Sequence, residues 1–296
     1  MTMNRRTFLE KSAAMLAALT SGRALALDSS LQEGKPAIAA VEGKSVPQAL
    51  DAALNALGGI KTFVGRGAKV VCLPNPQGSR PGVSTNPELM GTLVSRCLEA
   101  GAAEAVVASG HGAGRWYSTG IIEAVEKAGG KMVYPRSDGD WVEVPVPQGR
   151  HLKKAVIVRR ALENDVLINV PIVKQHDSTR VTCTMKNLMG FNSDNGSWHR
   201  SDDYLEHAIA ELASVIVPDL CVVDAITILT ENGPFGPGRT VSPRQVVAGV
   251  NQVSVDAYCC RFLDLDPREA VHIRIAAEMK LGDLDISRLK TIESKV

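Results

Sequence analysis

The stretch of the chain richest in chemically versatile side chains runs from residue 171 to 190, PIVKQHDSTRVTCTMKNLMG. It holds Lys174, His176, Thr179, Thr182, Lys186 and Asn187. Lysine ammonium groups donate hydrogen bonds to carboxylate or phosphate oxygens, and threonine hydroxyls add directional contacts. A histidine can transfer a proton near neutral pH or bind a metal ion through a neutral ring nitrogen. The stretch therefore predicts a site for a small anion, with a solvated loop and a threonine-rich edge strand as the alternative.

The elements that must position these residues follow a βαβ rhythm, in which short apolar runs alternate with amphipathic segments. We predict strands at residues 69–73, 104–109, 166–170, 220–224 and 246–250, and helices at 86–100, 118–128 and 204–217. All-apolar strands are typical of a sheet that helices cover on both faces. The predicted fold is therefore α/β, with a mostly parallel sheet covered by helices on both faces and a polar, lid-like loop at residues 192–203.

Ligands of open α/β sheets bind beyond the carboxyl ends of the strands, so the residues that follow each predicted strand are the candidates for chemistry. This rule gathers Asn75, the glycine loop 110–114, Lys174, His176, Asp224 and Asn251 at one rim. We interpret Lys174, His176, Lys186 and Asp224 as catalytic, and Thr179, Thr182, Asn187, Asn75 and Gly112 as substrate-binding. A divalent metal is one possible cofactor, and its candidate ligands are His176, Asp224 and Asp256.

Other motifs carry weaker signals. The glycine loop misses the spacing of a dinucleotide-binding fingerprint, so a tight strand-to-helix turn is the favoured interpretation. His207 and Glu211 lie four residues apart and are predicted to face solvent as a pair. Asp256 has helix capping as its alternative role. Residues 232–238, NGPFGPG, are predicted to form a rigid loop bordering the rim.

The first 26 residues read as a signal peptide rather than as part of the fold. Adjacent Arg5 and Arg6, a short apolar middle and a small-x-small end are typical of the twin-arginine export signal. An amphipathic helix packed on the body is the alternative. We expect residues 27–296 to form a single α/β domain that is soluble, periplasmic or otherwise extracytoplasmic, with no stable membrane insertion. The twin-arginine export machinery would then be a partner of the precursor.

Charge and cysteine usage narrow the function classes. The net charge is +1, and the signal segment carries the positive excess, so the body is close to neutral and nucleic acid is excluded as the main partner. Six scattered cysteines show no C-x-x-C pair, which makes an iron–sulfur cluster an unlikely cofactor. We expect them to be small buried hydrophobes, with a disulfide as the main alternative.

The lysine-rich string has the pattern P-x-x-K-x-H-x-x-T-x-x-T-x-x-x-K-N-x-x-G. Together with GPFGPG, VNQVSVDAYCC and LPNPQGSRPGVSTNPELMGTLVSRCLEAGA, it resembles the domain of unknown function family 362 over residues 67–265. No general reaction is established for that family. The resemblance implies importance for Lys174, His176, Thr179, Thr182, Lys186, Asn187, Asp224 and Asp256. Many members carry a fused ferredoxin-like segment with clustered cysteines, and this chain shows no such segment.

Three function classes remain open. The first is an enzyme acting on a small anionic molecule, a carboxylate or a phosphate, with lysines holding the anion and His176 as acid or base. The second is a non-catalytic ligand-binding or accessory protein. The third is a cofactor-bearing redox partner, which the export route favours and the cysteine spacing disfavours.

Replacing both Arg5 and Arg6 with Lys tests the predicted export by the twin-arginine route. The change keeps the charge but removes the paired guanidinium groups that twin-arginine recognition requires. We expect the precursor to accumulate in the cytoplasm, as measured by cell fractionation and immunoblotting. Export at the normal rate would show that the segment is a general secretory signal or no signal.

Overall fold

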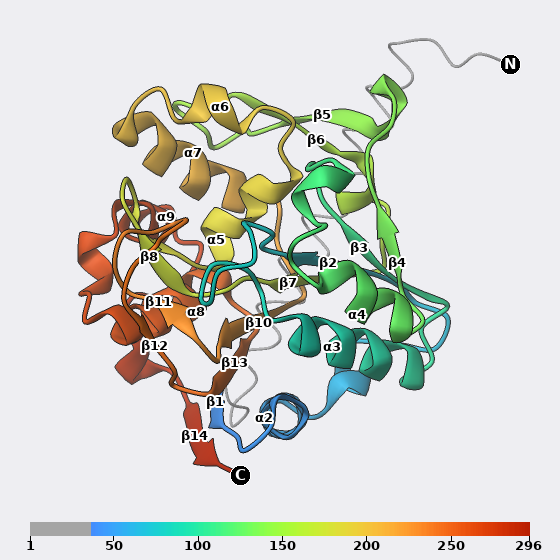
Figure 1. Ribbon diagram of the computed structural model, residues 1–296. Helices are drawn as coiled ribbons and strands as arrows, with labels where there is room; N and C mark the ends of the chain where they lie inside the picture. Colours follow the sequence, from blue (N-terminus) through green and yellow to red (C-terminus); the bar gives the residue numbers. More distant parts are fainter. Residues whose placement is uncertain (1–36) are drawn as a thin grey trace, which may run out of the picture. The chain divides into compact units, whose positions relative to one another are not determined.

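A central sheet of eight strands organises the described part of the chain, residues 37–296 of a computed structural model (Figure 1). The strand order is β14-β1-β13-β10-β7-β2-β3-β4. The strands are β1 (Ile38–Glu42), β2 (Lys69–Pro74), β3 (Glu104–Ala108), β4 (Lys131–Val133), β7 (Val166–Val170), β10 (Leu220–Ala225), β13 (Gln245–Gly249) and β14 (Thr291–Lys295). The predicted signal segment, residues 1–26, lies outside the described residues.

Strand direction confirms the predicted mostly parallel sheet, with one strand as the exception. Every neighbouring pair is parallel except the two pairs that β13 makes with β1 and β10. Because β13 runs the opposite way, its carboxyl end points to the other edge of the sheet. The prediction that Asn251 joins the rim is therefore wrong. Its side chain instead accepts a hydrogen bond from the Ser254 N–H, at 3.0 Å, and caps helix α8 (Gln252–Cys259).

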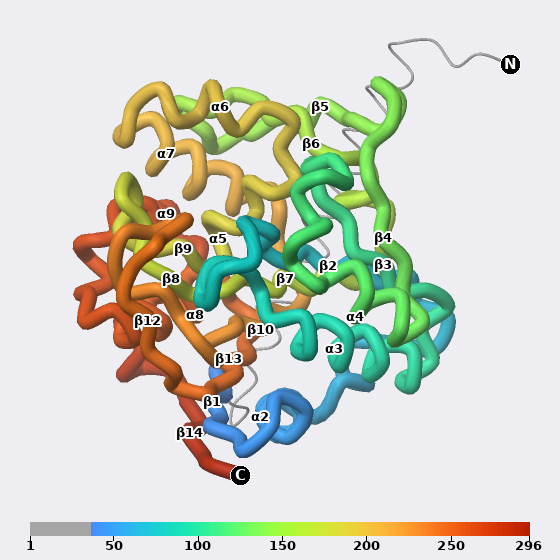
Figure 2. Tube along the Cα trace, in the orientation of Figure 1, coloured from blue at the N-terminus to red at the C-terminus, as the bar shows by residue number. Residues whose placement is uncertain are grey.

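Helices cover both faces of the sheet, as predicted (Figures 1 and 2). One face carries α2 (Val46–Ala56), α3 (Pro87–Glu99) and α4 (Ile121–Lys127). The other face carries α5 (Thr184–Asn187), α7 (Asp202–Ala213), α8 and α9 (Val271–Glu278). Helix α3 begins where the sequence predicted, because the Asn86 side chain accepts the backbone N–H groups of Glu88 and Leu89.

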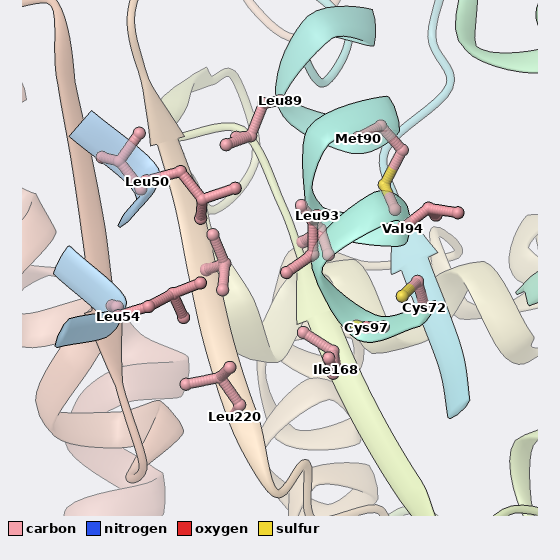
Figure 3. Packing of buried hydrophobic residues seen from close by; sticks show 14 of the residues in the cluster. Leu50, Leu54, Cys72, Leu89, Met90, Leu93, Val94, Cys97, Ile168 and Leu220 are labelled. Carbon is pink, nitrogen blue, oxygen red and sulfur yellow. The ribbon is translucent and has the colours of Figure 1, made fainter. Parts of the chain in front are cut away.

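The hydrophobic core lies between the sheet and the α2–α3 layer (Figure 3). Leu50 of α2 and Leu93 of α3 are fully buried, with α2 packed against β1 and β13 and α3 packed against β3. Burial of such side chains is the main driving force that holds helix and sheet together. The carboxyl ends of the central strands are therefore held by a closely packed layer.

Three two-stranded hairpins extend from the sheet layer. They are β5 (Trp141–Pro145) with β6 (Lys154–Val158), β8 (Lys174–His176) with β9 (Arg180–Thr182), and β11 (Ile228–Leu229) with β12 (Thr240–Val241). The short helices are α6 (Asn195–Trp198), η1 (Ile60–Thr62), η2 (Ala113–Arg115), η3 (Asp138–Asp140), η4 (Arg159–Ala161), η5 (Leu188–Phe191), η6 (Cys260–Leu263), η7 (Pro267–Glu269) and η8 (Ile286–Arg288). The stretch 171–190 is thus a β8–β9 hairpin followed by α5 and η5.

All six cysteines lie among the described residues, and every one is buried with a free thiol. This confirms the prediction that they are small buried hydrophobes. The structure contains no disulfide among these six cysteines. Within residues 37–296, no helix combines the length and the apolar character needed to cross a membrane.

Cys260 provides a test of this packing. Its thiol is fully buried, so Cys260→Ala should lower the free energy of unfolding by about 1 kcal/mol through lost contacts. Cys260→Ser should cost more, by roughly 1–3 kcal/mol, because it buries a hydroxyl that needs a partner. Urea denaturation of both variants measures the difference. A serine variant as stable as the alanine variant would show that the thiol lies in a polar environment.

Candidate functional site

A pocket of about 260 Å³ opens at the carboxyl edge of the parallel strands. Segments that are far apart in the sequence line it: residues 74–77 after β2, His111 and Arg115 after β3, the β8–β9 hairpin, the α5–η5 segment, Asn195 and His199 of the 192–203 stretch, and Pro234 with Phe235. Of the predicted site residues, it brings together Asn75, Lys174, His176, Thr182, Lys186 and Asn187. The predicted lid and the predicted NGPFGPG loop each contribute residues to its wall.

Lys174 lies at the start of β8 with its side chain fully buried. Its ammonium group donates one hydrogen bond to Asn75 Oδ1, at 3.1 Å, and one to the carbonyl oxygen of Val83, at 2.5 Å. Burial, together with the neighbouring charge of Lys186, lowers the pKa of Lys174 to about 7. The amine is therefore divided between its charged and neutral forms at neutral pH.

A relay of side-chain amides holds Asn75 in place. Its Nδ2 donates to Asn187 Oδ1 at 3.0 Å, and Asn187 Nδ2 donates to Asn169 Oδ1 and to the carbonyl of Leu73, both at 2.8 Å. Because each amide nitrogen points along this chain, Asn75 turns its oxygen toward Lys174. The relay joins the ends of β2 and β7 to α5.

Lys186 presents a different situation, since it lies on α5 with only 8% of its surface exposed. The one acceptor that it reaches in the described part of the chain is the Met189 sulfur, at 3.7 Å, and a thioether is a weak acceptor. Burial lowers the pKa of Lys186 to about 8, although Glu206 and Asp177 oppose the shift. The Thr182 hydroxyl, in the same pocket wall, is buried and has no partner among residues 37–296. The pocket therefore holds two buried polar groups that lack good partners.

His176 is buried and lines the same pocket as the two lysines. Burial first, and then the charges of Lys186, His199 and Lys174, lower the pKa of His176 to about 2, so its imidazole is neutral at pH 7. The backbone N–H groups of Ser178 and Thr179 donate to its Nδ1 at 3.2 and 3.4 Å. The Asp177 carboxylate, 2.9 Å from the same atom, is mostly exposed and already accepts the Ser178 N–H.

The two predicted aspartates lie outside the pocket wall. Asp224 accepts the backbone N–H groups of Asn86 and Ile226, at 2.7 and 2.9 Å, and burial raises its pKa to about 7. Asp256 accepts the N–H groups of Thr184 and Met185, so it holds the start of α5, and burial raises its pKa as well. Because each carboxylate has separate partners, the structure does not bring the candidate metal ligands His176, Asp224 and Asp256 together.

Two predicted substrate-binding residues also lie outside the wall. Thr179 is buried, and its hydroxyl donates to the carbonyl of Val181 at 3.1 Å. Gly112 is exposed, with open space around the position of a Cβ atom. Its neighbours His111 and Arg115 line the pocket in its place. The sequence signal for His111 and Arg115 is their position after a buried strand, within or next to the glycine loop 110–114.

The prediction that His207 and Glu211 of α7 both face solvent is wrong for Glu211. Glu211 is only 2% exposed, and its carboxylate accepts the backbone N–H groups of Arg150, His151 and Leu152. Helical spacing placed Glu211 on the polar face of α7, but the loop between β5 and β6 covers that part of the face.

The fold and pocket define an α/β protein with a cationic site at the carboxyl edge of a mostly parallel sheet. The chain belongs to the family described as domain of unknown function (DUF362), whose model matches residues 70–261, and this confirms the resemblance. A curated relative, the thylakoid-associated protein sll1697 of Synechocystis sp., is 29% identical over 258 residues, which cover 81% of this chain and 76% of that protein.

Two solved structures are distant matches. A Thermotoga maritima protein shares 14% identity with a TM-score of 0.41, and the match covers 79% of this chain and 58% of that one. The lactate racemase apoprotein of Thermoanaerobacterium thermosaccharolyticum shares 13% identity with a TM-score of 0.38, over 69% of this chain and 54% of that one. This chain thus spans little more than half the length of either.

Asp224 gives the stability of the folded protein a predictable pH dependence. Its pKa is raised from 3.8 to about 7 in the folded state, so its stabilising contribution is full below about pH 4 and is lost as the pH rises through 7. Over this range it should make the free energy of unfolding fall by on the order of 1.4 kcal/mol per pH unit. Asp224→Asn should flatten that slope, as measured by urea denaturation at a series of pH values. Identical slopes for wild type and variant would contradict the assignment.

Proposed function

We propose that this protein is an enzyme that binds a small anionic substrate, a carboxylate or a phosphate, in the pocket at the carboxyl edge of the sheet. The observation that carries the proposal is the Lys186 ammonium, which is buried with only a thioether in reach among the described residues. A buried charge without a partner is costly, so the pocket favours a ligand that brings negative charge.

The donors around Lys186 suit an anion with several oxygens. The Thr182 hydroxyl is unpaired among the described residues and adds a directional donor. Arg115, at the exposed rim, donates one N–H to Gln77 Oε1 at 3.1 Å, and its guanidinium group carries further N–H donors. Asp177 is the only carboxylate among the lining residues, so cationic groups outnumber anionic ones. A volume of about 260 Å³ limits the substrate to a small molecule.

Proton transfer falls to Lys174 in this proposal. A pKa of about 7 lets its amine both accept and donate a proton near neutral pH, which is the condition for efficient general acid–base catalysis. His176, with a pKa lowered to about 2, acts as a neutral hydrogen-bonding group. A bound anion would favour the protonated forms of both groups, so substrate binding itself tunes their proton affinity.

A non-catalytic ligand-binding protein is the second candidate. The observation that favours it is that Lys174 already donates hydrogen bonds to Asn75 and Val83, and such bonds can serve a purely structural purpose. In this case Lys186 would still bind the anion, but no bond of the ligand would change.

We also propose that the chain is exported by the twin-arginine route and acts outside the cytoplasm. The support is the paired Arg5 and Arg6 ahead of a short apolar run. The proposal is independent of the pocket and has its own test in the arginine replacement.

The two lysines should separate binding from chemistry. Lys186→Met should weaken binding of the anion by roughly 10- to 100-fold, because a charge-assisted contact contributes about 1.5–3 kcal/mol. Lys174→Met should keep most of the affinity but lower turnover by about a hundredfold or more. A thermal-shift screen with inorganic phosphate and small carboxylates identifies the anion. For a carboxylate, NMR in D₂O then detects exchange of a carbon-bound proton.

Lys61→Met serves as the control, because Lys61 is exposed and lies outside the pocket wall. Equal affinity of wild type and Lys186→Met, or no anion that protects the wild type, would disprove the anion site. Binding without any turnover in the wild type would select the non-catalytic alternative.

A further inference from the structure

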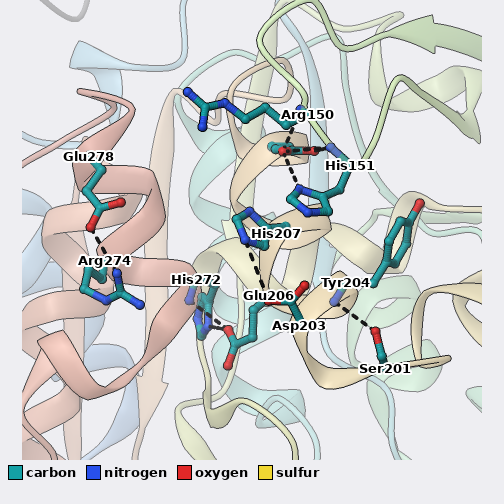
Figure 4. A network of polar contacts seen from close by, with 11 residues as sticks. Arg150, His151, Ser201, Asp203, Tyr204, Glu206, His207, His272, Arg274 and Glu278 are labelled. Carbon is teal, nitrogen blue, oxygen red and sulfur yellow. Dashed lines mark hydrogen bonds and ion pairs between the residues drawn. The ribbon is translucent and has the colours of Figure 1, made fainter.

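A second cluster of ligand-type side chains lies away from the pocket, where the β5–β6 loop meets α7 (Figure 4). His151 comes from the loop, while Asp203 and His207 are one turn apart on the helix. One nitrogen or oxygen atom from each lies within 4.8 Å of the others. The two imidazole rings stack with centroids 3.9 Å apart, and His207 Nε2 is 3.9 Å from Asp203 Oδ1.

Glu211 fixes the loop that carries His151. Its carboxylate accepts the backbone N–H of Arg150 at 2.8 Å, of His151 at 3.1 Å and of Leu152 at 2.6 Å, so the loop backbone is tied to α7. Its Oε1 also lies 3.5 Å from His151 Nδ1. A carboxylate behind a histidine is the usual arrangement that orients a metal-binding imidazole. The position of His151 over His207 is therefore set by a buried contact and not by a mobile surface side chain alone.

We propose that His151, Asp203 and His207 bind a divalent transition-metal ion of the zinc class, with Glu211 as the positioning residue. Two imidazoles and a carboxylate are a ligand set that Zn²⁺ accepts, and such sites keep one position open for water or another ligand. Tetrahedral ligands at about 2.0–2.2 Å from zinc lie roughly 3.3 Å from one another. The present spacing is up to 4.8 Å, so binding requires the exposed Asp203 side chain and the stacked imidazole rings to turn toward a common point.

The site is separate from the anion pocket, because none of its three ligands lines the pocket wall. It also differs from the metal set that the sequence suggested, which shares no residue with it. In the sequence, one histidine is followed 52 residues later by Asp-x-x-x-His on a helix. This pattern alone does not predict a metal site. Only the covering of α7 by the loop joins the three residues.

The test is a calorimetric titration of Zn²⁺ into the full chain, freed of its affinity tag and treated with a chelator. We expect one ion per chain at this site. His207→Gln and Asp203→Asn should each weaken binding by more than the roughly 10- to 100-fold that is typical of an outer partner. Asp202→Asn is the matched control, because it removes the neighbouring helix carboxylate, which is outside the cluster.

Co²⁺ gives an independent readout, since its visible absorption reports a tetrahedral site. The band should be present in wild type and Asp202→Asn and absent from His207→Gln. Melting temperatures in chelator verify that the variants are folded. No Zn²⁺ binding by the wild type, or equal binding by His207→Gln, would overturn the proposal. So would an ion that is lost in His176→Gln and retained in His207→Gln, because it would lie in the pocket.

Discussion

The buried ammonium group of Lys174 is the constraint around which the pocket is built. A charge taken out of water must find acceptors within the protein, and here Asn75 and the Val83 carbonyl supply them. Asn75 presents its oxygen because its amide nitrogen donates to Asn187, and Asn187 donates in turn to Asn169. The ends of two strands and the last residue of α5 are therefore coupled to the protonation of one amine.

Apart from Asp177, which lines the pocket, the buried carboxylates of this region hold backbone rather than face the pocket. Asp256 holds the start of α5, Asp224 joins the end of β10 to the start of α3, and Glu211 fixes the β5–β6 loop. Glu206 Oε2 accepts the backbone N–H of His272 at 2.8 Å and lies 2.6 Å from Nδ1 of the same residue. Because these negative charges are occupied behind the wall, the wall itself stays cationic. That separation is the physical basis for expecting an anion.

Much of the fold was predictable from local patterns. All five predicted strands and the three predicted helices are present, since buried strands are continuous apolar runs and helix starts carry capping side chains such as Asn86. The limits of the helices were less accurate: α4 begins at Ile121, after Gly120 in a left-handed conformation, and α7 at Asp202, after the capping Ser201. The sequence of β13 carries no local signal for its antiparallel direction, so the prediction places Asn251 at the wrong edge of the sheet.

The candidate site divides in the same way. The sequence by itself determined which residues carry chemistry in the 171–190 stretch, because their types and density stand out without reference to any other segment. It could not determine that Lys186 lacks a good partner while Lys174 has two, nor that Asp224 and Asp256 face backbone. Those outcomes depend on contacts between segments as distant as Asn75 and Asn187. Burial, which shifts the pKa values and leaves a charge without a partner, is a property of packed neighbours, so only the tertiary structure decided it.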